Sequence, residues 1–259
     1  MPHGLSCQSN EVALLVYQPR TYRRLVRSPG LVSYEIVEHE TSVLISTQIN
    51  LEHEARTLIR EFRRSLEDYI SHTPYFAASL VPVDVPTDAP PIVQEMSAAA
   101  KLASVGPMAT VAGAIAQNVG TALSQLSPEV IIENGGDIYL KSQKSRLVAI
   151  YAGDSVLSNT LGLEITPEET PIGICTSSAT VGPSLSLGHT DATVAIATSA
   201  TIADAAATAI GNAVGSADEI NQGLSAAQSI PGLIGAVIIV GDKLGVWGDL
   251  RLRTLTKEP

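Results

Sequence analysis

The order of apolar and polar positions predicts antiparallel strands in the first part of the chain. Apolar residues alternate with polar ones over residues 31–37 and again over 42–46, and the polar stretch Glu38-His39-Glu40-Thr41 separates the two runs. Alternation with a period of two is typical of strands that bury one face. We therefore expect a hairpin here.

A long amphipathic helix is predicted over residues 51–70, where apolar residues recur at three- and four-residue spacing. Asn50 can cap its first turn. The stretch 73–91 is rich in proline and is expected to be a loop or extended crossover, and it is the best candidate for an internal joint in a single domain spanning residues 1–259.

Two helices are expected after this stretch, over residues 92–104 and 108–126, with Pro107 suited to the first turn of the second. The second helix is rich in Ala and Gly, and small residues at this density let another backbone pack closely. The remaining strands are expected at 130–133, 137–140, 147–151, 161–166, 172–175, 192–197 and 233–240, and the remaining helices at 202–214 and 217–227. Because strands come in runs rather than in regular βαβ alternation, the pattern predicts an α+β fold of mainly antiparallel sheet packed with helices.

Composition and charge narrow the function classes. The chain has 259 residues, of which 45% are hydrophobic, and a formal net charge of −10. This charge argues against nonspecific binding to nucleic acid or to an anionic membrane. The first ten residues lack the features of a signal peptide, and no apolar run approaches the roughly 20 residues that span a bilayer. We therefore expect a soluble, cytoplasmic protein.

Common catalytic motifs are absent from the sequence: there is no phosphate-binding P-loop, no His-Glu-x-x-His and no Gly-x-Ser-x-Gly. Three other segments are candidates for chemistry: Asn134-Gly135-Gly136-Asp137, Cys175-Thr176-Ser177-Ser178, and a helix that carries Asp204 and Thr208 four residues apart. A carboxylate and a hydroxyl on one helix face can supply oxygen ligands to a hard cation. Alternatively, Asp204 only favours the helix N-terminus and Thr208 only packs.

The two cysteines, Cys7 and Cys175, make neither a disulfide framework nor a zinc site. Cys175 is open to two interpretations. It is either a reachable thiol at the exit from a strand or a small buried apolar residue. Among the five histidines only His189 lies close to a candidate segment, between the serine loop and an aspartate.

The three candidate segments, taken in order, resemble motifs of the ApbE-type flavin transferase superfamily. Those proteins carry an Asn-x-Gly-Gly-Asp-Ile turn, an Ala-Thr-Ser-Gly loop and an Ala-Asp-Ala-x-Ala-Thr-Ala helix. The chain is more closely similar to an uncharacterised branch, the UPF0280-type proteins, which share a Tyr-x-x-Arg start, a Pro-Met-Ala-x-Val-Ala-Gly-Ala-Ile-Ala helix and a Cys-Thr-Ser-Ser-x-Thr-Val-Gly loop. Here the start is Tyr17 to Arg20, the helix begins at Pro107 and the loop begins at Cys175.

The resemblance implies a nucleotide site with FAD or FMN and magnesium as cofactors. Asp204 would act in catalysis and hold the metal together with Thr208. The residues implied to contact the nucleotide are Asn134, Gly135, Gly136, Asp137, Thr176, Ser177, Ser178 and His189. The chain departs from the superfamily at Gln117, where the transferases have lysine, and from the branch at Pro183, where histidine is frequent. The expected function is therefore binding of a flavin or related dinucleotide, with pyrophosphate cleavage or FMN transfer.

Two alternatives stay open at this point. In the first, which the resemblance to the branch implies, the flavin site is lost and Cys175 serves a sulfur-assimilation enzyme (sulfide to homocysteine) or an accessory factor. In the second, the Ala- and Gly-rich helices belong to a non-catalytic scaffold and only pack against a second copy of the chain. A homodimer is compatible with all three readings. For the leading one, the expected partner is a small-molecule nucleotide ligand, with no nucleic acid and no membrane.

Overall fold

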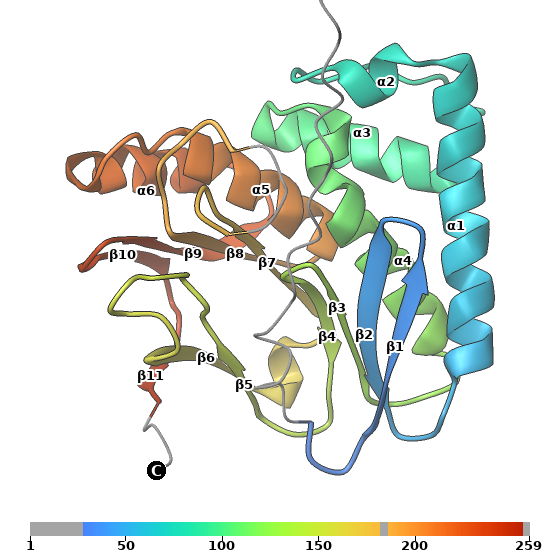
Figure 1. Cartoon of the computed structure of the whole chain (residues 1–259), viewed down its shortest axis with the longest axis horizontal. Helices are drawn as coiled ribbons and strands as arrows, with labels where there is room; N and C mark the ends of the chain where they lie inside the picture. The colour runs from blue at the N-terminus through green and yellow to red at the C-terminus, as the bar shows by residue number, and fades with distance from the viewer. Residues whose placement is uncertain (1–27, 182–185, 256–259) are drawn as a thin grey trace, which may run out of the picture.

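The computed structural model describes residues 28–181 and 186–255, and it shows a layer of helices, an eight-stranded sheet and a small three-stranded sheet (Figure 1). The strands are β1 Val32–Glu38, β2 Thr41–Thr47, β3 Val130–Asn134, β4 Asp137–Lys141, β5 Arg146–Ala149, β6 Leu161–Ile165, β7 Ile172–Ser177, β8 Ala192–Ala197, β9 Leu233–Val240, β10 Lys243–Gly248 and β11 Leu252–Thr254. The α-helices are α1 Glu52–His72, α2 Tyr75–Ala78, α3 Pro91–Ala103, α4 Val111–Leu123, α5 Ala200–Asn212 and α6 Ile220–Ser229, and short 3-10 helices are η2 Pro107–Thr110, η3 Pro167–Glu169 and η4 Ala217–Glu219.

The large sheet has the order β1-β2-β3-β4-β7-β8-β9-β10, and the small sheet has the order β11-β6-β5. Every pairing is antiparallel. This arrangement confirms the predicted α+β class of antiparallel sheets packed with helices.

Alternation along the strands gives the large sheet two apolar faces and the molecule two cores. In β7, Cys175 lies in the cluster on the helix side, whereas Ile172 and Ile174 lie in the cluster shared with the small sheet. The same alternation in β8 turns Ala195 toward the helices and Val194 toward the small sheet. A sheet covered on both faces explains why its central strands read as continuous apolar runs.

α5 packs against β7 and β8 of the large sheet, and small residues on both partners let it approach closely. Its buried face consists largely of alanines, such as Ala203 and Ala207. On the sheet, a Cβ at Gly173 would lie only 2.4 Å from the backbone of Ala200, so glycine is required there. This close approach fixes where the first turns of α5 lie.

The sequence prediction and the structure differ in several elements. β7 continues through Ser177, so Thr176 and Ser177 end a strand instead of beginning a loop. β10, β11 and α2 were not predicted. The start of α1 follows the prediction in part: the Asn50 side chain accepts a hydrogen bond from the Glu52 N–H at 2.9 Å, although the helix boundary falls at Leu51.

The proline-rich stretch 73–91 is packed against the helices. Phe76 is fully buried, Val83 is nearly so, and the Ser97 hydroxyl of α3 donates to the Val83 carbonyl. A Cβ at Gly106 would lie 1.9 Å from the Ser79 carbonyl oxygen, so the stretch also presses against the turn before η2.

Within residues 28–181 and 186–255, no single helix has the length and apolar character needed to cross a membrane. α3 and the segment from η2 to the end of α4 meet those criteria only together, as a pair bent by 100°.

Candidate functional site

Four segments that are distant in sequence meet at one end of the β3–β4 hairpin. The Asn134 side chain in the hairpin donates to the Ala112 carbonyl of α4 at 3.1 Å. The Gly113 N–H, one residue further along α4, donates to the Asp204 carboxylate of α5 at 2.8 Å. From β7, the Cys175 thiol donates to the Ala200 carbonyl at 3.2 Å. The structure therefore brings together all three segments singled out in the sequence.

The hairpin turn owes its two glycines to backbone conformation. Asn134 and Asp137 pair at the end of the β3–β4 ladder, and Gly135 and Gly136 between them have φ angles of 73° and 108°. Two consecutive positive φ angles are required by the commonest two-residue hairpin turn. At Gly136 a Cβ would meet nothing closer than the Thr176 carbonyl oxygen at 3.7 Å, so the φ angle and not crowding demands glycine.

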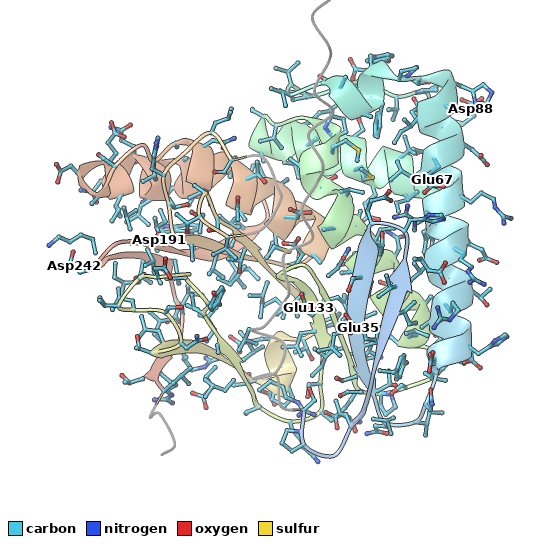
Figure 2. All side chains as sticks on the ribbon, in the orientation of Figure 1. Glu35, Glu67, Asp88, Glu133, Asp191 and Asp242 are labelled. Atoms are coloured by element: carbon cyan, nitrogen blue, oxygen red, sulfur yellow. The ribbon has the colours of Figure 1, made fainter. Side chains whose placement is uncertain are left out.

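Glu133 fixes this turn from within β3. Its carboxylate is buried and accepts the Gly136 N–H at 2.8 Å, and Figure 2 shows Glu133 near the centre of the molecule. Sequence reasoning missed Glu133, although an acid inside an apolar strand just before an Asn-Gly-Gly-Asp turn is a usable signal. The Gly136 N–H is therefore engaged inside the turn.

Close packing sets the position of Asp204. A Cβ at Gly113 would lie 2.3 Å from the Ala200 carbonyl oxygen and 2.7 Å from the Asp204 Cβ. Real Cβ atoms do not approach that closely, so only glycine lets α4 and α5 cross here. The Gly113 N–H can then reach the carboxylate directly.

The electrostatics of the site are dominated by two carboxyl groups. Asp137 is buried, with 7% of its surface exposed, and Asp204 is partly buried. Burial raises the pKa of Asp204 well above its ordinary value, and the nearby Asp137 charge raises it further, while the N–H groups of Gly113 and Ala112 oppose the rise. Two carboxylates in such a setting repel each other unless a cation or a proton lies between them.

Cys175 lies beneath this pair of acids. It is fully buried, so the reachable thiol at a strand exit is not what the structure shows, and the alternative interpretation as a buried residue fits. Burial raises the pKa of the Cys175 thiol well above its ordinary value, and the charges of Asp137 and Asp204 add to the rise. The thiol also makes a hydrogen bond with Asp137, which lies opposite it when the β4–β7 register is continued by one residue.

The other predicted residues have different surroundings. Thr208 is partly buried one turn beyond Asp204 on α5, in agreement with the predicted helix face. Thr176 and Ser177 end β7 beside the hairpin turn. Ser178 uses its hydroxyl to accept the N–H groups of Thr180 and Val181, at 3.1 and 3.0 Å, so it shapes the loop.

His189 is set apart from Asp204. Its N–H donates to the Val214 carbonyl at 2.8 Å, just beyond the C-terminal end of α5. Val214 follows Asp204 by ten residues, roughly 15 Å along a helix. Pro183, and the residues from Tyr17 to Arg20, lie outside the described residues.

Two polar side chains of neighbouring helices bind the start of α5: Gln117, which the sequence singled out only as a departure from the family lysine, and Glu95, which the sequence did not indicate. Gln117 of α4 accepts the Ala200 N–H at 2.8 Å and so caps α5 from the side. Glu95 of α3 accepts the Thr201 hydroxyl and the Asn118 amide, the latter at 2.7 Å. Neither interaction has a local signal, because each joins helices far apart in sequence.

The site shows no metal-binding cluster of the usual kind. Over residues 28–181 and 186–255, no group of three or more His, Cys, Asp or Glu side chains has a geometry that could hold a metal ion. The pairing of Asp204 with Thr208 as metal ligands stays a prediction.

Comparison with known proteins identifies the family. The model of the family described as "AbpE bacteria" matches residues 23–245. A UPF0280 protein of Methanocella arvoryzae is 44% identical over 193 residues, covering 74% of this chain and 78% of that protein. A UPF0280 protein of Methanocaldococcus jannaschii is 42% identical over 221 residues, covering 83% and 90%.

Solved structures agree at the level of the fold. The flavin transferase ApbE from Vibrio cholerae superposes with a TM-score of 0.57 at 14% identity, covering 84% of this chain and 96% of that one. The ApbE protein from Thermotoga maritima gives a TM-score of 0.52 at 14% identity, with 83% and 96% covered. The chain belongs to the UPF0280 branch of the ApbE-like superfamily.

Proposed function

We propose that this protein binds a flavin dinucleotide together with Mg²⁺ where the β3–β4 hairpin, α4 and α5 meet, and that it acts on the pyrophosphate. The observation that carries the proposal is the approach of Asp137 and Asp204, where burial and then the nearby Asp137 charge raise the pKa of Asp204. The family fold supports it, because the solved neighbours from Vibrio cholerae are named flavin transferases.

The donor chemistry fits magnesium. Asp137 and Asp204 offer carboxylate oxygens, and Thr208 offers a hydroxyl one turn along α5 from Asp204. Hard divalent cations prefer such oxygen ligands. A cation would also relieve the repulsion between the two acids, which is the main unfavourable interaction that a ligand could remove here. When bound, it would neutralise charge that develops on the diphosphate.

The residues of the chain itself hold this site in place. The Gly113 N–H orients Asp204, and the Cys175 thiol contacts Asp137 from below. The two glycines of the turn keep Asp137 at the end of its strand. Preorganised carboxylates of this kind need little rearrangement when a ligand arrives.

Gln117 bears on the choice between cleavage and transfer. It is neutral, and its oxygen is engaged with the Ala200 N–H, so this position supplies no cation to a phosphate group. FMN transfer in the manner of the lysine-bearing transferases therefore has less support than cleavage of the pyrophosphate. Product analysis separates the two, since cleavage releases free FMN and transfer leaves FMN bound covalently to protein.

The sulfur-assimilation alternative has little support from Cys175. A fully buried thiol whose pKa is raised stays protonated, whereas nucleophilic sulfur chemistry uses a thiolate. The alternative consequently lacks a site among the described residues that suits it.

A thermal-unfolding experiment tests the proposal. We expect FAD with Mg²⁺ at about 100 times Kd to raise the Tm by about 5–10 °C, and either component alone to raise it less. Asp204→Asn should remove this response. The variant should unfold no earlier than the parent without ligand, because the amide keeps an acceptor for the Gly113 N–H and ends the repulsion with Asp137.

The matched control is Asp88→Asn, on the exposed part of the 73–91 stretch, labelled in Figure 2. It should respond to FAD and Mg²⁺ as the parent does. No response of the parent to any flavin or adenine nucleotide would refute the proposal, and so would an undiminished response of Asp204→Asn. Separation of the products by chromatography, looking for FMN and AMP, then tests the chemistry.

A further inference from the structure

The two edges of the large sheet differ in how they are protected against pairing with another chain. Over the described residues, β1 pairs only with β2, and β10 pairs only with β9. β1 carries Glu35 and Glu38, and Glu38 forms ion pairs with Arg56 and Arg60 of α1 at 3.0 and 2.9 Å. Charged side chains on an edge strand oppose its use as a template.

β10 lacks this protection. Its sequence is Lys-Leu-Gly-Val-Trp-Gly, so its single charge is at the first position. Leu244 and Val246 are 42% and 37% exposed, and they lie on the same face, opposite the buried Ile239 and Val237 of β9. The apolar face of the sheet thus continues to a strand edge that bears few charges.

We propose that β10 pairs antiparallel with β10 of a second copy of this chain, about a two-fold axis at Val246. A self-complementary contact of this kind is the usual basis of a closed dimer. Adding a strand to an exposed sheet edge is also a recurrent mode of recognition, because main-chain groups supply the hydrogen bonds. The proposal does not depend on the proposed function.

The sequence around Val246 fits this register. Lys243 lies at the level of Asp249, the residue that follows β10 in the second copy, and Leu244 falls opposite Gly248 of the second copy. Opposite charges that lie close to each other across a strand pair stabilise it. Because the axis is two-fold, each of these pairings occurs twice.

Moving the two-fold axis by one residue removes the pairing of opposite charges. If the axis lay at Gly245, Lys243 would face Trp247 and Asp249 would face the turn at Gly241. Lys243 is free to change partner, since its amino group is 3.9 Å from Asp242 and both side chains are largely exposed. Figure 2 shows Asp242 at the outer end of this hairpin, on the side of the molecule away from Glu35.

The helices do not offer a better surface for a second copy. The small residues of α4 that suggested an interface, including Gly113, Ala114, Ala116 and Gly120, are buried inside the chain. Gly113 packs on α5, and Gly120 packs on the Tyr139 ring of β4. Their close-packing capacity is already used within one molecule.

Light scattering after size-exclusion chromatography tests the interface at about 100 µM protein. We expect a mass twice the chain mass of 27.1 kDa for the parent, and the mass of a monomer for Val246→Lys. The matched control Val37→Lys introduces the same charge on an exposed valine of the other edge strand and should stay dimeric. A monomeric parent, or a dimeric Val246→Lys variant, would overturn the proposal.

Two further variants decide the matter if Val246→Lys does not fold. Val246→Cys in a Cys7→Ser background should form a disulfide-linked dimer on mild oxidation, because Val246 faces itself across the axis, whereas Val37→Cys should not. Lys243→Asp should weaken the dimer by tenfold or more, and adding Asp249→Lys should restore it. Absence of the Val246→Cys cross-link, or no rescue in the charge exchange, contradicts the register.

Discussion

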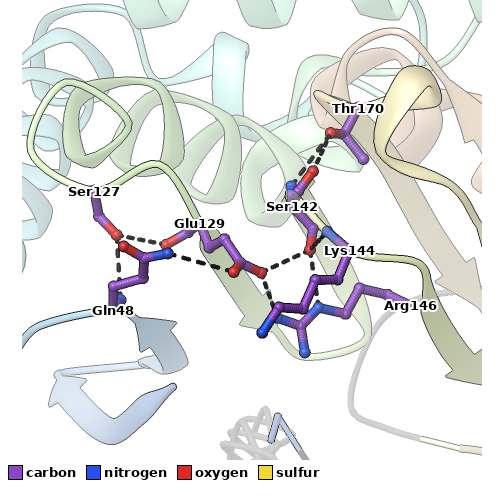
Figure 3. A network of polar contacts seen from close by, with 7 residues as sticks. All are labelled: Gln48, Ser127, Glu129, Ser142, Lys144, Arg146 and Thr170. Carbon is purple, nitrogen blue, oxygen red and sulfur yellow. Dashed lines mark hydrogen bonds and ion pairs between the residues drawn. The ribbon is translucent and has the colours of Figure 1, made fainter. Parts of the chain in front are cut away.

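Replacing Glu129 by glutamine should destabilise the protein strongly, because Glu129 is the centre of a buried polar network that joins the two sheets (Figure 3). Its carboxylate accepts the Ser142 hydroxyl at 2.8 Å and forms an ion pair with Arg146 of β5. The Gln48 amide of the loop after β2 lies 3.4 Å from the other carboxylate oxygen. The side chains of Glu129 and Arg146 are only 3% and 11% exposed.

The magnitude follows from this burial. Removing one partner of a buried ion pair costs about 3–5 kcal/mol, because the other charge is left uncompensated. Glutamine keeps one acceptor oxygen, so we expect a loss of roughly 2–4 kcal/mol, which corresponds to about 5–15 °C in Tm for a domain of this size. The matched control is Glu164→Gln: Glu164 pairs with Arg253 at 2.6 Å, but those side chains are 29% and 59% exposed, and the loss should stay below about 1 kcal/mol.

The effect should depend on pH in a defined direction. Burial alone raises the pKa of Glu129, but hydrogen bonds from Arg146, Ser142 and Gln48 outweigh it and lower that pKa below its ordinary value. A lowered folded-state pKa stabilises the protein above the unfolded pKa of about 4.3, and this contribution is lost as the pH falls through the folded pKa. The stability difference between the parent and Glu129→Gln should therefore be full at pH 7 and shrink below about pH 4.

Urea unfolding at pH 7 and at pH 3.5–5 measures both effects. The reasoning is refuted if Glu129→Gln loses no more stability than Glu164→Gln at pH 7, or if the gap stays constant as the pH falls. A double-mutant cycle with Arg146→Met would assign the coupling to the ion pair, for which we expect more than about 1.5 kcal/mol.

Two further outcomes follow from packing at the candidate site. Gly113→Ala should lower the free energy of unfolding in urea by about 1–3 kcal/mol, because its Cβ would lie 2.3 Å from the Ala200 carbonyl oxygen. The control Gly211→Ala, whose Cβ would meet nothing closer than 3.4 Å, should change that free energy by less than about 1 kcal/mol. Equal losses in the two variants would contradict the clash. Cys175 should resist iodoacetamide in the folded protein and react only in denaturant, as peptide mass mapping can show; rapid labelling under native conditions would contradict its burial.

Local patterns predicted most of the secondary structure because those signals are carried within one element. Alternation identified the β1–β2 hairpin, and three- and four-residue spacing identified α1. β10 was missed although a turn signal was present: Gly241 and Asp242 form a two-residue loop between Val240 and Lys243, with Gly241 at a φ angle of 61°. Its two glycines and short length masked the apolar alternation of the strand that follows.

The segments that form the candidate site could be predicted from the sequence, but the spatial arrangement of their side chains could not. Asp204 and Asp137 lie 67 positions apart in the sequence, and their approach depends on a contact between α4 and α5 that only Gly113 permits. The sequence shows Gly113 as one small residue among many. Its role emerges only when the neighbouring Ala200 carbonyl is in place, since the same glycine in a solvated helix would only weaken it.

Strand geometry likewise accounts for the burial of Cys175, which the residues after it did not indicate. A cysteine beside Thr176 and Ser177 looks accessible in sequence because polar residues follow it, yet β7 runs on through Ser177, and its helix-facing positions lie under α5. Exposure in a sheet is decided by which face a side chain takes and by what covers that face. Here α5 covers it, and the thiol donates to the Ala200 carbonyl and bonds to Asp137, one of the two acids proposed to hold a cation.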